Sequence, residues 1–156
     1  MITSAVVAGM GIVGLGGLSP RTPERRLVIR QQRAEDNIFR RVPLRGDETV
    51  RMTWMHSVDK TPWTEYYSID QGDLLLDCTD LRLMGAGTPS NAPHTELVGD
   101  DVRLCGLNER FPALRWIHSH RVHHRIYLND ELILPTSAVP HHTKVEMIVA
   151  RTQERI

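Results

Sequence analysis

The sequence is short of aromatic residues, of lysine and of net charge. Its 156 residues include two Phe, three Tyr and three Trp, so a core must be built mainly from Leu, Val, Ile and Met. Nineteen basic residues balance nineteen acidic ones. That balance leaves no overall field to draw the chain onto nucleic acid, and we expect no nucleic-acid partner. The length provides room for one domain.

Cysteine is also scarce, and neither Cys78 nor Cys105 belongs to a Cys-x-x-Cys pair. Nothing near either residue suggests a catalytic thiolate. In an exported protein the pair allows one disulfide, which would stabilise the fold by roughly 3 to 4 kcal/mol. Two separate buried thiols are the alternative, and the sequence leaves this choice open.

The N-terminal stretch has no charge over residues 2–18, and the residues that follow, 21–26, are strongly basic. As a helix the apolar stretch would span about 25 Å, near the short limit for a bilayer core of about 30 Å. We expect residues 1–20 to form an apolar helix that acts as a signal peptide or membrane anchor. A buried glycine-rich segment is the alternative. We expect an extracytoplasmic domain, although basic residues that follow the apolar run favour a cytoplasmic one by the positive-inside rule.

From residue 26 to residue 152, short runs of β-forming residues alternate with turn residues. Residues 49–57 place Val50, Met52 and Trp54 on one face, which is the pattern of a half-buried strand. Residues 63–69 and 74–83 follow after short connections, which predicts consecutive hairpins. The sequence predicts an all-β domain, an antiparallel sandwich or barrel of about eight short strands. A short helix over residues 23–35 is the one helical alternative.

Two stretches of the sequence resemble a known family. Residues 54–67 are Trp-Met-His-Ser-Val-Asp-Lys-Thr-Pro-Trp-Thr-Glu-Tyr-Tyr, and residues 84–89 are Met-Gly-Ala-Gly-Thr-Pro. A strand that ends in His-Ser-Val, a Thr-Pro loop, a Glu on the returning strand and a later Gly-Ala-Gly-x-Pro loop resemble the domain of unknown function 1850 family. The resemblance covers most of residues 26–150. It implies a small protein with a membrane-targeting segment whose gene often sits beside those of TAXI-class TRAP transporters, and it implies no known reaction.

The first stretch holds most of the expected ligand-binding residues. His56 and Ser57 end one predicted strand, Lys60 and Thr61 lie in the loop, and Glu65 lies on the returning strand. Loops at strand ends often display binding residues, so we expect this cluster to bind a small ligand or a partner, with His56 hydrogen-bonded to Glu65. The alternative is that these residues only pin the hairpin. A hydrolytic Ser57–His56 pair is not expected, because neighbours in a strand point to opposite faces.

The second stretch adds Gly85, Gly87, Thr88 and Pro89 to the expected ligand-binding set. A glycine-rich turn can present backbone N–H groups to an anion. The turn lacks the Lys and the strand-to-helix context of a nucleotide-binding loop, so no nucleotide is expected. A tight chain reversal is the structural alternative.

Histidines provide a second hypothesis, because His118, His120 and His124 could bind zinc, copper or nickel. No carboxylate or cysteine completes a standard metal spacing, and the leading interpretation includes no cofactor. That interpretation is a non-enzymatic extracytoplasmic β-domain, an accessory or ligand-binding component of a TAXI-class TRAP transporter. Its expected partners are a transporter subunit or a small solute. The alternative is a His-rich transition-metal-binding protein or a metal-assisted hydrolase.

Overall fold

The computed structural model describes residues 25–82, 88–89 and 92–151. Within them the chain is all β, with eleven strands and one 3-10 helix, η1 (Thr136–Ala138). The strands are β1 (Arg25–Gln31), β2 (Ala34–Leu44), β3 (Val50–Met55), β4 (Pro62–Asp70), β5 (Asp73–Leu81), β6 (His94–Val98), β7 (Asp101–Phe111), β8 (Leu114–Ile117), β9 (Arg125–Leu128), β10 (Glu131–Leu134) and β11 (Lys144–Arg151). The predicted all-β class is confirmed, and the predicted count of about eight strands is too low.

Two sequence-based expectations concern helices. The apolar N-terminal helix lies outside the described residues, and no helix in the described part of the chain is long and apolar enough to cross a membrane. The alternative of a short helix over residues 23–35 is wrong, since β1 and the start of β2 occupy its described residues. The backbone pairs β1 with β2 and β11, which supplies hydrogen bonds that a short isolated helix lacks.

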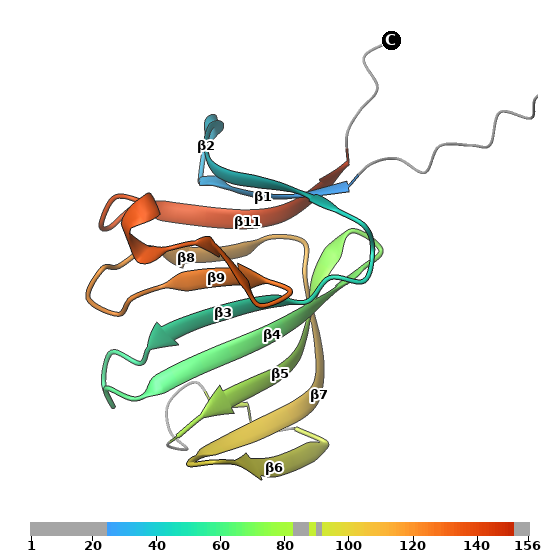
Figure 1. Cartoon of the computed structure of the whole chain (residues 1–156), viewed down its shortest axis with the longest axis vertical. Coiled ribbons are helices and arrows are strands. Elements are labelled where there is room, and N and C mark those ends of the chain that lie inside the picture. Colours follow the sequence, from blue (N-terminus) through green and yellow to red (C-terminus); the bar gives the residue numbers. More distant parts are fainter. Residues whose placement is uncertain (1–24, 83–87, 90–91, 152–156) are drawn as a thin grey trace, which may run out of the picture.

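The strands form two antiparallel sheets that pack against each other (Figure 1). The four-stranded sheet has the order β2-β1-β11-β8, and the seven-stranded sheet has the order β10-β9-β3-β4-β5-β7-β6. Their shared core includes Leu27 and Ile29 from β1, Met147 from β11, and Val50 and Tyr67 from β3 and β4. All five are at most 1% exposed. Alternate residues of each strand therefore face the other sheet, as the alternation in the sequence predicts.

Tight turns fix the register of the hairpins. Gln71 and Gly72 connect β4 to β5 with φ values of 52° and 97°. Asn129 and Asp130 connect β9 to β10 with φ values of 47° and 65°. Two successive positive φ values are typical of type I′ turns, whose twist matches that of the paired strands. The predicted β3–β4 and β4–β5 hairpins are confirmed by the strand pairing.

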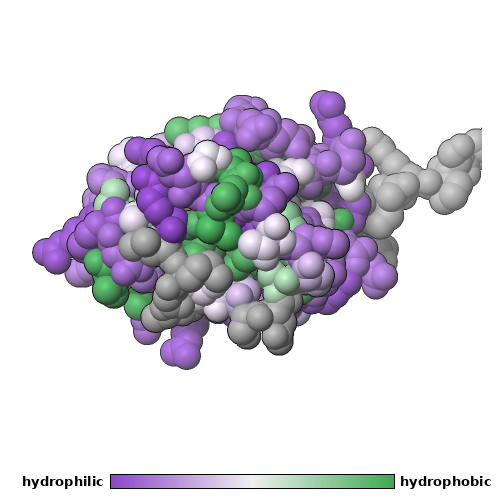
Figure 2. Space-filling view, turned by 90° about the horizontal axis from the view of Figure 1, so that it is seen from below, coloured by the Kyte–Doolittle hydropathy of each residue, from purple (hydrophilic) through white to green (hydrophobic). Residues whose placement is uncertain are grey.

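β6 is the strand that the sequence pattern predicts least well. All five of its residues are exposed, with Leu97 at 81%, so no apolar alternation marks it. It is a strand because it pairs with β7 along its whole length. It also forms an edge of the seven-stranded sheet, and the view from that side shows hydrophobic side chains gathered in the middle of a hydrophilic surface (Figure 2).

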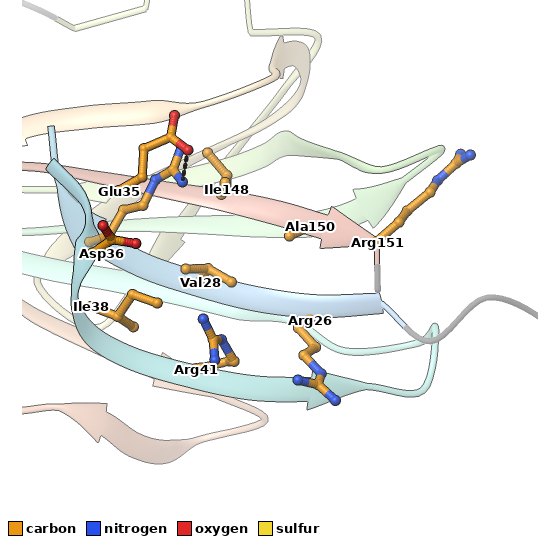
Figure 3. Close-up of a pocket in the computed structure, with 10 residues that line it drawn as sticks. Arg26, Val28, Glu35, Asp36, Ile38, Arg41, Ile148, Ala150 and Arg151 are labelled. Atoms are coloured by element: carbon orange, nitrogen blue, oxygen red, sulfur yellow. Dashed lines mark ion pairs between the residues drawn. The ribbon is translucent and has the colours of Figure 1, made fainter. Parts of the chain in front are cut away.

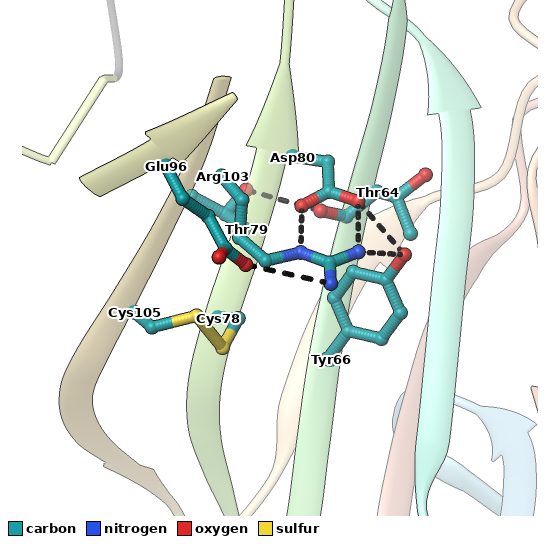
Figure 4. Close-up of polar contacts among 8 residues, drawn as sticks. All are labelled: Thr64, Tyr66, Cys78, Thr79, Asp80, Glu96, Arg103 and Cys105. Carbon is teal, nitrogen blue, oxygen red and sulfur yellow. Dashed lines mark hydrogen bonds and ion pairs between the residues drawn. A yellow bond between two sulfur atoms is a disulfide. The ribbon is translucent and has the colours of Figure 1, made fainter. Parts of the chain in front are cut away.

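The cysteines, left undecided by the sequence, form a disulfide between β5 and β7 (Figure 4). Cys78 and Cys105 are direct cross-strand partners, 27 residues apart in sequence. Beside them, Arg103 makes two hydrogen bonds of 2.7 and 2.8 Å to the carboxylate of Asp80, and the Tyr66 hydroxyl donates to the same carboxylate at 2.8 Å. A covalent bond and a charged hydrogen-bond network thus hold together β4, β5 and β7, three adjacent strands of the larger sheet.

Candidate functional site

The turn between β3 and β4 holds four of the predicted site residues, His56, Ser57, Lys60 and Thr61. Its backbone is closed by two hydrogen bonds, from the N–H of His56 to the carbonyl of Thr61 (2.8 Å) and from the N–H of Lys60 to the carbonyl of His56 (3.0 Å). The ammonium of Lys60 also donates to the carbonyl of Ser57. Ser57 and Lys60 are exposed, so they lie at the surface of the turn and not inside a pocket.

The imidazole of His56 is oriented by Asp59, a residue that sequence reasoning did not select. Its Nδ1 lies 2.8 Å from Oδ2 of Asp59, and the ring centroid lies 5.4 Å from that of Trp63. An aspartate on Nδ1 fixes the tautomer and orientation of a histidine. Within the described residues no hydroxyl or thiol is hydrogen-bonded to Nε2 of His56.

Glu65 faces the interior of the fold from β4. It accepts a hydrogen bond from the hydroxyl of Tyr67, two residues further along the same face. Burial raises the pKa of Glu65, the Tyr67 hydrogen bond opposes this rise, and the nearby carboxylate of Glu109 adds to it. The predicted hydrogen bond between His56 and Glu65 is not formed, because His56 is paired with Asp59 and Glu65 with Tyr67.

Trp63 lies between these two groups and is the centre of the site. It is 8% exposed and packs against Leu81 and Leu104. Its ring stacks on that of Trp54, with centroids 5.7 Å apart and planes at 17°. The indole N–H of Trp63 is buried and has no acceptor among the residues that the structure describes. An unsatisfied buried donor of this kind is rare and destabilises a fold by roughly 1 to 3 kcal/mol.

Sequence reasoning quoted Trp63 as part of a motif but did not place it in the site. The available signal was the strand register, since Trp54 and Trp63 are directly opposite each other in the β3–β4 hairpin. Cross-strand aromatic pairs are a common source of sheet stability, so the register alone indicates a structural role. The unsatisfied N–H becomes apparent only from the packing.

Described residues on both sides of the predicted glycine-rich loop lie near Trp63. Gly85 and Gly87 lie outside the described residues, whereas Thr88 and Pro89 are described and half-buried. The loop leaves β5 at Leu81, which is directly opposite Trp63, and on its return Ala92 packs against the Trp63 cluster. The two ends of the loop are therefore anchored beside the indole ring.

A hollow of about 320 Å³ opens at this end of the seven-stranded sheet. Both tryptophans contribute to its lining, together with polar and charged side chains from β3, β4, β9 and the turn before β9. The lining residues are Thr53, Trp54, Met55, Pro62, Trp63, Thr64, Val122, His123 and Arg125. Thr53 and its cross-strand partners Thr64 and Arg125 alternate along their strands with the inward-facing tryptophans, so this hollow lies on the outer face of the sheet, opposite the buried Trp63 ring.

The three histidines of the alternative hypothesis do come together, but their nitrogens are used by the backbone. Nε2 of His118 lies 2.8 Å from the carbonyl of Thr136, and Nε2 of His120 lies 2.8 Å from that of Val139. Nδ1 of His124 accepts the N–H of Ser119 at 3.0 Å. In the described part of the chain no group of three or more His, Cys, Asp or Glu is placed to hold a metal ion. These hydrogen bonds favour a role in fixing loops.

Burial lowers the pKa of two of these imidazoles. Desolvation lowers the pKa of His118, which is fully buried. Desolvation, with a smaller effect from His118, lowers the pKa of His124 to about 4. The ring of His124 also lies 6.3 Å from that of Trp54, which stacks on Trp63. Two groups that the sequence treats separately are thus neighbours across β3.

Taken together, the two antiparallel sheets, the cross-strand disulfide and a tryptophan-centred site at one end define a small disulfide-containing β domain with a candidate binding site. The chain belongs to the family described as domain of unknown function (DUF1850), which it matches over residues 50–133. This confirms the resemblance seen in the sequence. The match includes the β3–β4 turn, the glycine-rich loop, both cysteines and the three histidines. Neither the curated proteins nor the solved structures that were searched contain a match.

Proposed function

We propose that this protein is a non-enzymatic extracytoplasmic binding domain, anchored or secreted through residues 2–18, that serves as an accessory or ligand-binding component of a TAXI-class TRAP transporter. The observation that carries the proposal is the buried indole N–H of Trp63. It has no acceptor among the described residues and lies within the segment that marks the family. A solute that presents a carbonyl or carboxylate oxygen would satisfy this donor.

The surroundings of Trp63 suit such a ligand. The stacked ring of Trp54 and the imidazole of His56 provide flat apolar and polar surfaces on two sides. Glu65 lies two residues along β4 from Trp63, where burial raises the pKa of its carboxyl. Orientation of His56 by Asp59 further restricts how a ligand can lie in the site.

The disulfide supports the proposed extracytoplasmic location. Disulfides persist in oxidising surroundings and are rare in the reducing cytoplasm of mesophiles. The Cys78–Cys105 bond joins β5 and β7, two neighbouring interior strands of the larger sheet, where it contributes to stability. A structural disulfide of this kind favours an extracytoplasmic domain over the cytoplasmic orientation that the basic residues after the apolar stretch favour.

The non-enzymatic assignment rests on the site itself. Ser57 is exposed on the turn, and its sequence neighbour His56 turns its Nδ1 to Asp59. Acyl transfer needs a nucleophile hydrogen-bonded to the base and donors for the oxyanion. Only the orienting aspartate is present among the described residues of the turn, and that arrangement suits ligand orientation better than catalysis.

The decisive experiment measures ligand binding by calorimetry with the oxidised full chain, using small carboxylate and carbonyl solutes that the associated transporter takes up. Trp63→Phe removes the N–H and keeps an aromatic ring, so affinity should fall about tenfold, the equivalent of one hydrogen bond. Trp116→Phe is the matched control, because it removes the indole N–H that points to His118 from the other sheet. Absence of binding by the wild type, or equal binding by Trp63→Phe, would overturn the proposal.

The extracytoplasmic location and the association with a transporter are tested in separate experiments. Protease added to intact spheroplasts should digest the domain if it is extracytoplasmic, and protection until lysis would contradict that placement. Deletion of the gene should reduce uptake of the transported solute in whole cells. Unchanged uptake would remove the transporter from the proposal without affecting the binding measurement.

A further inference from the structure

We propose that the outer face of the four-stranded sheet docks on an anionic phospholipid surface. A groove of about 510 Å³ crosses this face between β1, β2 and β11 (Figure 3). Three arginines, Arg26, Arg41 and Arg151, line its part near the N-terminal end of β1, and Val28, Ile38 and Ile148 are among its apolar lining residues. These six residues are called the arginine groove below.

The arginine groove has an apolar floor in spite of facing outward. Val28 points away from the shared core, yet it is only 6% exposed. Its direct cross-strand partners are Arg41 on β2 and Ile148 on β11. Apolar side chains flanked by arginines match the layered chemistry of a membrane surface, where glycerol and upper acyl carbons lie beneath phosphate groups.

Basic and acidic side chains lie at opposite ends of the groove. Arg26, Arg41 and Arg151 lie near the N-terminal end of β1, where Arg26 pairs with Ala150 and Val28 with Arg41. Glu35 and Asp36 line the other end, beside the β1–β2 turn. One end is thus attracted to an anionic surface and the opposite end is repelled, which fixes an orientation in addition to an affinity.

Arg30, which also lines the groove, is neutralised by carboxylates. Arg30 lies 2.8 Å from a carboxylate oxygen of Glu146 and 3.4 Å from one of Glu35. Arg41 and Arg151, by contrast, are exposed and make no ion pair with any other residue that the structure describes. Basic charge near the N-terminal end of β1 therefore remains available to a partner, whereas the positive charge of Arg30 at the far end is balanced by carboxylates.

The connection to the N-terminal segment selects a membrane as the partner. β1 begins at Arg25, and only residues 19–24 separate it from the uncharged residues 2–18. Six residues reach at most about 20 Å when fully extended. This step rests on the membrane anchoring in the proposed function: if residues 2–18 are held in a bilayer, the arginine end of the groove stays within reach of its headgroups.

Hydrogen–deuterium exchange of the full chain in lipid nanodiscs tests the docking. One nanodisc contains phosphatidylcholine alone, and the other contains an equal mixture of phosphatidylcholine and phosphatidylglycerol. β2 is an edge strand, so amides along its outer side lack a strand partner and report directly on coverage. We expect slower exchange across β2 only in the anionic nanodisc, and loss of this protection at about 1 M salt, where the Debye length falls to about 3 Å.

Two variants separate the groove from general charge. Arg41→Gln with Arg151→Gln should lower the ratio of docked to undocked domain about 25-fold, because each arginine near an anionic surface contributes about fivefold. Arg121→Gln, in the exposed turn between β8 and β9, is the matched control and should leave protection unchanged. Thermal unfolding in detergent checks that all variants remain folded.

Each outcome is decisive. Equal exchange of β2 in the two nanodiscs, or equal protection in the double variant and the wild type, overturns the docking. If the chain is nevertheless found in the nanodisc fraction, the proposed anchoring still stands. Protection by phosphatidylcholine alone also overturns the docking, since the surface then needs no anionic lipid. A full chain that stays out of the nanodisc fraction refutes the anchoring, and the docking with it, but leaves solute binding at Trp63 as a separate measurement.

Discussion

Reduction of the Cys78–Cys105 disulfide should destabilise the domain by an amount that follows from the length of the loop it closes. The cysteines are 27 residues apart in sequence. The loop-entropy relation then gives about 12 cal/mol/K, or about 3.6 kcal/mol at room temperature. For a domain of this size the same change lowers the midpoint of thermal unfolding by roughly 10 °C or more.

The measurement is urea unfolding of the full chain in detergent, with and without a thiol reductant. The wild type should lose about 3.6 kcal/mol on reduction. A variant with both cysteines changed to Ala should start near the reduced value and show no response to the reductant. Single substitutions are less informative, since each leaves one thiol free to form a bond between chains.

Two outcomes would refute this reasoning. A loss below about 1 kcal/mol on full reduction would mean that the denatured chain keeps the two cysteines close, so the bond constrains little. A response of the double-alanine variant to the reductant would show that reduction acts elsewhere. An increase in the slope of unfolding free energy against urea is expected on reduction, because an uncrosslinked denatured chain exposes more surface.

Three further predictions concern pH, a turn and a charged network. Burial lowers the pKa of His124 to about 4, so the folded form binds fewer protons than the unfolded chain between about pH 4 and 6.5. The contribution of neutral His124 to the unfolding free energy is therefore fully present above this window and is lost as the pH falls through it. His124→Gln should make the unfolding free energy, measured with urea, less dependent on pH across the window. Gln71→Asn should raise the unfolding free energy by roughly 0.5 kcal/mol, because Asn tolerates the positive φ of this turn better, and a decrease measured by urea unfolding would contradict the type I′ assignment. Asp80→Asn should lower the unfolding free energy by about 2 kcal/mol through loss of the charged acceptor for Arg103 and Tyr66, and an unchanged thermal midpoint would show that the network is not stabilising.

Local signals allowed the central hairpins to be predicted. The alternation through Val50 and Met52 identifies β3 and the face it buries, and Gln71-Gly72 identifies the reversal into β5. The sequence does not reveal β6, because exposed residues such as Leu97 carry no burial pattern and the strand depends on hydrogen bonds from β7. Edge strands of this kind are defined by their neighbour more than by their own residues.

The sequence predicts the β3–β4 hairpin that carries the candidate residues, but it does not predict the contacts of their side chains. Strand parity places His56 and Glu65 on one face, which the sequence anticipates, but a local turn gives His56 the partner Asp59 and position i+2 gives Glu65 the partner Tyr67. The adjacency of His124 to this site depends on pairing of β3 with β9, which are far apart in the chain. Non-local pairing has no signature in a single sequence.

The relative positions of the arginine groove and the Trp63 site determine which kind of partner can reach each of them. The turn between β3 and β4 lies at the end of the sandwich opposite the N-terminal end of β1 (Figure 1). If the arginine groove holds the N-terminal end of β1 against the membrane, Trp63 and the turn point into the aqueous compartment. A solute or a soluble transport component would then reach Trp63, whereas a membrane-embedded subunit would meet β1 and β2. Crosslinking from the turn and from β2 should therefore capture different partners, and capture of the same membrane subunit from both would contradict the orientation.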